Sequence, residues 1–143
     1  MSILKKENIF LNQKVSNKEE AIKIAGQILV DQGYVKEEYI TEMLKREELT
    51  STYMGNYLAI PHGTEEGKAA VLHSGLSVVQ VPEGVDFGNG NIVKILIGIA
   101  GKDNEHLDIL SKIAIVCSEV ENVEKLVNAQ SVEEILQLLG EVN

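Results

Sequence analysis

The sequence predicts an α/β fold, namely a three-layer domain with a small mixed β-sheet covered by helices on both faces. Helical and strand patterns are interleaved, with helices before, between and after the strands, as is typical of this architecture. The apolar run at residues 92–100 is nearly continuous, as in a central strand that is buried on both sides. With 143 residues the chain can bury one sizeable core. We therefore expect residues 1–143 to form a single domain.

The first helix is predicted by its two ends. Ser16 with Glu19, or Asn17 with Glu20, has the spacing of a capping box, and either pair would begin the helix. Small and aliphatic residues then repeat at helical spacing as far as Gly33, which is a good stop signal.

A second helix is predicted over about residues 36–48. Its inner stripe would consist of Ile40, Met43 and Leu44. Arg46, the only arginine of the chain, falls in the last turn, where a cation is favoured by the helix dipole.

The strands are predicted from short apolar runs. They lie at residues 9–11, 58–61, 76–81 and 92–100. Residues 50–56 are polar and indicate a loop, residues 64–70 indicate one or two helical turns, and residues 82–84 and 88–91 carry turn signals.

Three helices are predicted after the last strand. The first follows Asp103-Asn104 and runs to about Glu119, a short one covers residues 122–127, and the last begins at a capping box of Ser131 with Glu134. The inner stripe of the first is expected at Leu107, Leu110, Ile113, Ala114 and Cys117. Cys117 should therefore be a buried structural cysteine.

Composition argues against several classes of function. The chain carries 13 basic and 22 acidic side chains, a formal charge of −9, whereas nucleic-acid binding needs clustered Lys and Arg. A partner with a basic face suits it better. A single cysteine allows no intrachain disulfide. No signal peptide is visible, and no apolar run approaches the roughly 20 residues of a membrane span. We expect a cytoplasmic protein without membrane insertion.

His62 is the strongest candidate for chemistry. Pro61 restricts the backbone before it, Gly63 lets the chain turn away after it, and Thr64 can cap the following turn. Backbone N–H groups at such a helix start bind phosphate. On Pro-His-Gly alone, a structural histidine in a turn remains the alternative.

His106 is the second candidate. It lies in the first turn of a helix, where the dipole favours a neutral ring, and it follows the central strand, where α/β sheets place their sites. A capping or surface histidine is the alternative. Nothing near His73 suggests chemistry. The three histidines lack the short spacing of metal-binding pairs, so we expect no metal and no cofactor.

The run from Arg46 to Thr64 resembles the active-site signature of the enzyme IIA domains of the mannitol/fructose type. These domains belong to the bacterial phosphoenolpyruvate-dependent sugar phosphotransferase system. The matching features are an Arg-Glu pair at a helix end, a Thr-rich loop, a Gly and then Ala-Ile-Pro-His-Gly-Thr. The similarity covers nearly the whole chain, and Asn104-Glu105-His106-Leu107 is similar to the mannitol-specific branch in particular. Tyr57 and Ser51 depart from the family pattern, which often has a small residue and a proline there.

The resemblance implies that His62 accepts a phosphoryl group on Nε2 from the phosphocarrier protein HPr. It would pass the group to a cysteine of the mannitol-specific IIB domain of the permease. His106 would position the phosphoryl oxygens, while Arg46 would pair with the phosphoryl group or, as we favour, brace the loop at residues 50–56. Met54, Tyr57 and Leu58 are candidates for an apolar docking patch. A regulatory nitrogen- or stress-type module and a fructose-specific IIA remain alternatives.

Overall fold

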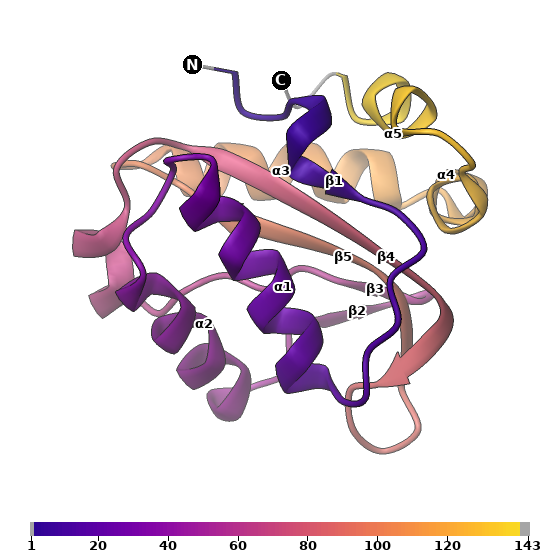
Figure 1. The fold of residues 1–143 in the computed structure, drawn as a ribbon, viewed down its shortest axis with the longest axis horizontal. Coiled ribbons are helices and arrows are strands. Elements are labelled where there is room, and N and C mark those ends of the chain that lie inside the picture. The colour runs from indigo at the N-terminus through magenta and orange to yellow at the C-terminus, as the bar shows by residue number, and fades with distance from the viewer. Residues whose placement is uncertain (1, 141–143) are drawn as a thin grey trace.

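The computed structural model describes residues 2–140, and its strands form a five-stranded mixed sheet, which lies between the helices in Figure 1. The strand order is β1-β4-β5-β3-β2. The strands are β1 (Ile9–Phe10), β2 (Tyr53–Gly55), β3 (Leu58–Ala59), β4 (Gly75–Asp86) and β5 (Ile92–Ala100). β4 pairs with β1 in parallel and with β5 in antiparallel orientation, while β3 is parallel to β5 and antiparallel to β2. The predictions of a mixed sheet and of a central strand at β5 are confirmed.

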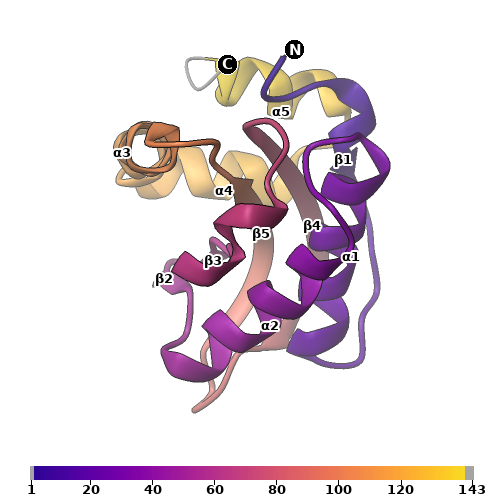
Figure 2. The same cartoon turned by 90° about the vertical axis from the view of Figure 1, so that its left-hand side faces the viewer.

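Helices cover both faces of this sheet, so the predicted three-layer architecture is confirmed (Figure 2). One face carries α1 (Lys18–Asp31) and α2 (Glu38–Leu49). The other carries α3 (Glu105–Cys117), α4 (Val120–Asn128) and α5 (Val132–Leu138). Two short 3-10 helices, η1 (Lys6–Asn8) and η2 (Glu65–Ala70), complete the fold. Within residues 2–140, no helix combines the length and the apolar character that a membrane span requires.

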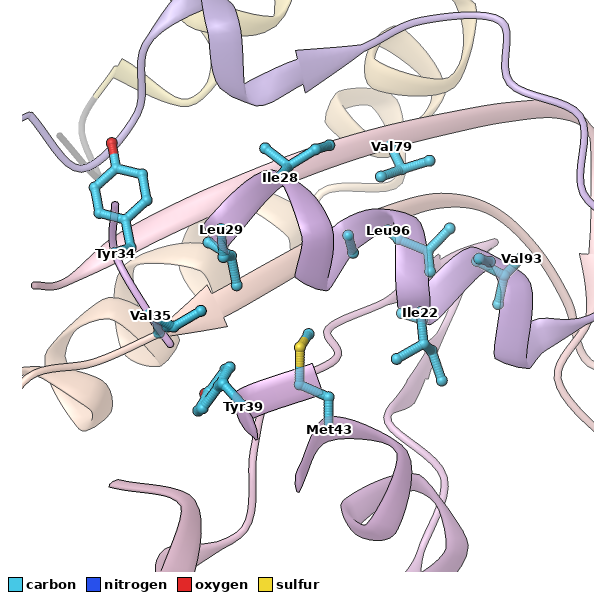
Figure 3. Close-up of a cluster of buried hydrophobic side chains, with 14 of the residues drawn as sticks. Ile22, Ile28, Leu29, Tyr34, Val35, Tyr39, Met43, Val79, Val93 and Leu96 are labelled. Atoms are coloured by element: carbon cyan, nitrogen blue, oxygen red, sulfur yellow. The ribbon is translucent and has the colours of Figure 1, made fainter. Parts of the chain in front are cut away.

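Each face of the sheet builds its own apolar core. Val79 points toward α1 and α2, whereas its neighbour Val78 points toward α3 and α4, because successive residues of a strand face opposite sides. Figure 3 shows the first cluster, in which Ile22 and Leu29 of α1 lie close to the strands and Met43 of α2.

The caps of α1 decide between the two predicted starts. The Asn17 side chain accepts a hydrogen bond from the Glu20 backbone N–H at 2.9 Å, and the Glu20 carboxylate accepts one from Ser16 N–H at 3.0 Å. The helix therefore begins after Asn17. Gly33 follows the end of α1 with a φ of 81°, which is the conformation expected of a glycine stop.

The loop prediction for residues 50–56 is partly wrong, because β2 lies inside it. Gly55 pairs with Leu58, so Asn56 and Tyr57 form the turn of a hairpin, with φ of 51° and 70°. Both central residues have positive φ, as in the type I′ turns that favour tight hairpins. The Lys94 ammonium lies over the Tyr57 ring, 4.8 Å from the ring centroid. This short strand exists through its pairing with β3, which a polar sequence does not reveal.

The predicted turn at residues 82–84 is wrong, because β4 continues through it. The register of β4 and β5 shifts between Gln80 and Val85, and Gly84 has a φ of 84°. A bulge of this kind tolerates Pro82, which has no N–H to donate to a ladder. The chain reverses instead at the other predicted turn, where the Phe87 N–H donates to the Asn91 carbonyl at 2.9 Å.

The predicted inner stripes of two helices are partly wrong. Leu107 is 72% exposed and Ala114 is exposed, whereas the buried residues of α3 are Ile109, Ile113 and Cys117. Apolar residues occupy nearly every face of this helix, so its phase could not be read from the sequence. In α2 the fully buried positions are Tyr39, Met43 and Glu47 rather than Ile40 and Leu44. Two of these three are polar, and Tyr39 contacts the site described next.

Candidate active site

The two candidate histidines meet at one edge of the sheet. His62 follows β3 and forms an isolated parallel bridge with Ile99 of β5, while His106 lies in the first turn of α3, directly after β5. β3 and β5 are parallel, so the connections that leave them emerge at the same edge. The two imidazole rings lie 5.2 Å apart between centroids and are tilted by 54°.

The His62 ring is fixed in one tautomer by the backbone. Its Nδ1 lies 2.8 Å from the Ile60 carbonyl oxygen. Because a carbonyl can only accept a hydrogen bond, Nδ1 must carry the proton and donate it. Nε2 is then left unprotonated in the neutral ring, with a lone pair available for nucleophilic attack.

The environment of both rings favours their neutral forms. Burial lowers the pKa of His62, which the Ile60 carbonyl raises in part, and the charges of His106 and Arg46 lower it further. Burial also lowers the pKa of His106, with the nearby Lys68 charge acting in the same direction. His62 is therefore in its nucleophilic form at neutral pH.

Tyr39 of α2 holds the backbone beside His62. Its buried hydroxyl accepts a hydrogen bond from Gly63 N–H at 2.9 Å and donates one to the Ile99 carbonyl at 2.7 Å. Burial raises the pKa of Tyr39 to about 12, so the hydroxyl stays protonated. A Cβ on Gly63 would lie 2.6 Å from the tyrosine ring. Glycine is thus required here by close approach.

Thr64 caps η2, as the sequence predicts. Its hydroxyl oxygen accepts a hydrogen bond from Gly67 N–H at 3.2 Å and donates to the Glu42 carboxylate of α2. This bond is the main cause of a lowered Glu42 pKa. The role of η2 backbone N–H groups in binding phosphate stays a prediction.

Arg46 lies in the last turn of α2, as predicted, and its Nη1 donates to the Thr50 carbonyl at 2.6 Å. This contact agrees in geometry with bracing of the loop. Pairing of Arg46 with a phosphoryl group stays a prediction.

An open cleft of about 740 Å³ lies in front of His62, between α2 and the start of η2. Its lining includes Arg46, Leu49, Gly63 and Thr64. The cleft is large enough to admit part of a partner protein and a phosphoryl group to the imidazole.

Met54 and Tyr57 of the predicted docking patch are 52% and 46% exposed, but Leu58 is only 2% exposed, so its inclusion was wrong. Leu58 packs into the core as a residue of β3.

Cys117 is buried, as predicted, and burial raises the pKa of its thiol to about 11. His73 is exposed between η2 and β4. Among residues 2–140, no three His, Cys, Asp or Glu side chains are grouped to hold a metal ion.

Sequence reasoning did not assign a role to Tyr39 or Glu42, which accept hydrogen bonds from the Gly63 N–H and the Thr64 hydroxyl. Tyr39 was hidden in the middle of a helix whose stripe was expected elsewhere. The signal that could have revealed it is a large polar residue one turn before Met43 on the buried side of α2.

Comparison with known proteins identifies relatives of this chain. Residues 2–142 match the family model described as "Phosphoenolpyruvate-dependent sugar phosphotransferase system, EIIA 2". The chain is 68% identical over 143 residues to the mannitol-specific phosphotransferase enzyme IIA component of Geobacillus stearothermophilus, covering 100% of this chain and 99% of that protein.

Two solved structures from Escherichia coli are also similar. The crystal structure of IIA mannitol shares 46% identity at a TM-score of 0.89, covering 95% of this chain and 98% of that one. The complex of enzyme IIA of the mannitol system with phosphorylated enzyme IIB shares 42% identity at a TM-score of 0.89, with coverage of 96% and 97%.

Proposed function

This chain belongs to the EIIA 2 family of the phosphoenolpyruvate-dependent sugar phosphotransferase system, and from that premise we propose that His62 is its phosphoryl-carrying residue. The chain is a phosphotransferase component that takes a phosphoryl group from HPr and passes it to the mannitol-specific IIB domain, in support of mannitol uptake. Because the chain exchanges a phosphoryl group with HPr and with a permease domain, we place it in the cytoplasm.

The proposal for His62 depends on one observation. The Nδ1–H of His62 donates to the Ile60 carbonyl at 2.8 Å, so that Nε2 is the nitrogen with a free lone pair. The ring also lines the open cleft. The same hydrogen bond stabilises the ring after transfer, because a ring with phosphorus on Nε2 still carries its proton on Nδ1.

The reaction needs one bond to form and one to break at each step. In the first, the Nε2 lone pair attacks the phosphorus of phospho-HPr, and the P–N bond to the donor imidazole breaks with its electron pair returning to that ring. In the second, the thiolate of the IIB cysteine attacks the same phosphorus, and the bond to Nε2 of His62 breaks. Positioning and charge stabilisation supply most of the catalysis in such transfers.

His106 is the group best placed to assist. Its ring lies 5.2 Å from that of His62 between centroids, and a phosphoryl group on Nε2 would bring oxygens within reach of a donor on the second ring. Arg46 lines the same cleft. We propose that it braces the loop through Thr50 and that its charge is felt at the phosphoryl group at longer range.

The test is mass spectrometry of the intact chain after incubation with phosphoenolpyruvate, the first enzyme of the system and HPr. We expect one added phosphoryl group that is lost in mild acid, as for a phosphoramidate. His62→Ala should show no addition, whereas the matched control His73→Ala, which changes an exposed histidine, should be phosphorylated normally. Acid-labile phosphate on His62→Ala would disprove the assignment.

A second measurement tests the acceptor. Added IIB domain and permease should remove the phosphoryl group when mannitol is present. Phosphate that stays on the chain in the presence of IIB, permease and mannitol would favour the regulatory alternative.

A further inference from the structure

Glu47 is a buried acidic residue that the transfer chemistry does not use directly. It lies in α2 beside Arg46 and is 5% exposed. One carboxylate oxygen accepts two hydrogen bonds from Thr52, from the backbone N–H at 2.9 Å and from the hydroxyl at 2.7 Å. The other oxygen lies 3.6 Å from the Lys18 ammonium and accepts no hydrogen bond among residues 2–140.

A carboxylate in this place is costly. Burial removes its hydration, and the partly exposed Lys18, whose charge offsets that of Glu47, lies too far away for a hydrogen bond. Its position in the last turn of a helix also places it near the negative end of the dipole. Glu47 therefore depends on its two hydrogen bonds from Thr52, which tie α2 to the segment that leads to His62.

The bonds that Glu47 accepts are the first in a series of hydrogen bonds that leads to the reactive ring. Thr52, held by Glu47, accepts a bond from Ile60 N–H through its own carbonyl at 3.1 Å. The Ile60 carbonyl in turn accepts the Nδ1–H of His62 at 2.8 Å. Thr52 and Ile60 each donate an N–H toward the carboxylate and accept through their C=O from the His62 side. The N–H and C=O of one residue belong to different peptide groups, so this series acts by fixing backbone positions. The Glu47 charge also raises the pKa of the His62 ring, acting against the larger effect of burial.

We infer that Glu47 is a positioning residue for phosphoryl transfer, which fixes the Nδ1–H tautomer and the orientation of His62 through Thr52 and Ile60. The inference rests on the proposed role of His62 as phosphoryl carrier. It assigns to Glu47 no contact with the phosphoryl group. Its effect is to keep the Nε2 lone pair directed at the cleft before a donor arrives and to steady the ring after transfer.

Two substitutions at this position separate the hydrogen bonds from the charge. Glu47→Gln keeps an oxygen that can accept both bonds from Thr52, so we expect phosphoryl acceptance within a few-fold of the unsubstituted chain. Glu47→Ala removes the acceptor, so we expect kcat of acceptance from phospho-HPr to fall roughly 10- to 100-fold, as for other small misplacements of reacting groups. KM for phospho-HPr should change little, because Glu47 is buried.

The decisive readout is the tautomer of His62, measured from its ring 15N shifts in the unphosphorylated chain. We expect one Nδ1–H form in the unsubstituted chain and in Glu47→Gln, and a mixture of tautomers in Glu47→Ala. Two control variants test whether the effect is specific to Glu47. Glu38→Ala changes an exposed acid of the same helix, and Leu139→Ala destabilises the fold at a buried position in α5's C-cap. Both should keep the Nδ1–H form.

Each outcome has a defined meaning. A pure Nδ1–H form and full transfer rate in Glu47→Ala would overturn the inference, as would a mixture of tautomers in Leu139→Ala, since general loosening would then explain the effect. If Glu47→Ala does not fold, Thr52→Val removes one of the two bonds and should give a smaller shift of the same kind. The tautomer is read without any phosphoryl donor, so it stands even if His62 is never phosphorylated; that second failure would reject the proposed function alone.

Discussion

Two chain segments carry the histidines to the same edge of the sheet, and they are held very differently. The first joins β3 to η2 and contains His62. It is fixed from the α2 side at consecutive residues, since Gly63 donates to Tyr39 and Thr64 donates to Glu42. Together with the bond from Nδ1 to the Ile60 carbonyl, these contacts leave little freedom for the His62 ring.

The second segment joins β5 to α3 and contains His106. Asn104 at the start of α3 makes no side-chain capping bond. The segment is tied back mainly by Lys102, whose N–H donates to the Ser74 hydroxyl at 2.8 Å. The His106 ring has no hydrogen bond among residues 2–140, and its position depends on the close approach of Gly101 to the helix backbone.

The difference fits two tasks at one reaction centre. A nucleophile gains from being oriented before the donor arrives, because alignment then costs no entropy at the moment of reaction. A group that contacts the phosphoryl oxygens must follow them from donor to carrier to acceptor. We therefore interpret the β3–η2 segment as the fixed half of the site and the first turn of α3 as the adjustable half.

Removal of the adjustable group should have the largest effect on rate among the changes that spare His62. We expect His106→Ala to fold normally, because this ring has no hydrogen bond to lose, and to accept phosphate roughly 10- to 1000-fold more slowly, as when one transition-state hydrogen bond is removed. Rapid-quench kinetics with phospho-HPr measures it, and His73→Ala is the control. An unchanged rate would show that His106 takes no part in the reaction. It would also contradict the division of the site into a fixed and an adjustable half.

A change in the fixed half should disturb both fold and rate. In Gly63→Ala the new Cβ would lie 2.6 Å from the Tyr39 ring, so either the ring or the His62 backbone must shift. We expect the free energy of unfolding to fall by about 1–3 kcal/mol, as for other overpacked sites, and transfer to slow roughly 10- to 100-fold.

Denaturant unfolding and the same kinetics measure these effects. Gly140→Ala is the matched control, since a Cβ there meets nothing within 4 Å. Equal behaviour of the two alanine variants would show that α2 does not hold His62 in the way described.

The sequence predicted the parts of this molecule that depend on local pattern. The order of the elements, the buried β5 and the start of α1 at one of two caps all follow from periodicity and capping chemistry. The pairing of β2 with β3 and the bulge at Gly84 could not be predicted, because each depends on a neighbouring strand.

The residues of the candidate site were likewise predictable only where their signals are local in the sequence. His62 and His106 were found because a motif and a helix start are local features. The residues that hold His62 were not, since Tyr39 and Glu42 are 24 and 22 positions away along the chain from the groups they bind. Their polar side chains sit on a helix whose buried face was expected to be aliphatic. Only the packing of α2 against the β3–η2 segment gives them a role.

The smallest expected effect is on the pH dependence of the free energy of unfolding, and it involves both His62 and His106. Burial lowers the pKa of His62 and of His106 below the ordinary 6.5. Between 6.5 and the lowered values the unfolded chain binds more protons than the folded chain, so the free energy of unfolding should decrease as pH falls through this range. Above it both forms are neutral and the effect vanishes.

The measurement is urea unfolding from pH 7.5 down to about pH 5, above the range in which the lowered pKa of Glu42 would contribute. His62→Ala and His106→Ala should each flatten the slope. His62→Ala should flatten it more, because His62 is the more deeply held ring, although the Ile60 carbonyl offsets part of its shift. A steeper slope after either substitution would mean that the folded protein favours the imidazolium at that position, which is the opposite of the neutral pair on which phosphoryl acceptance depends.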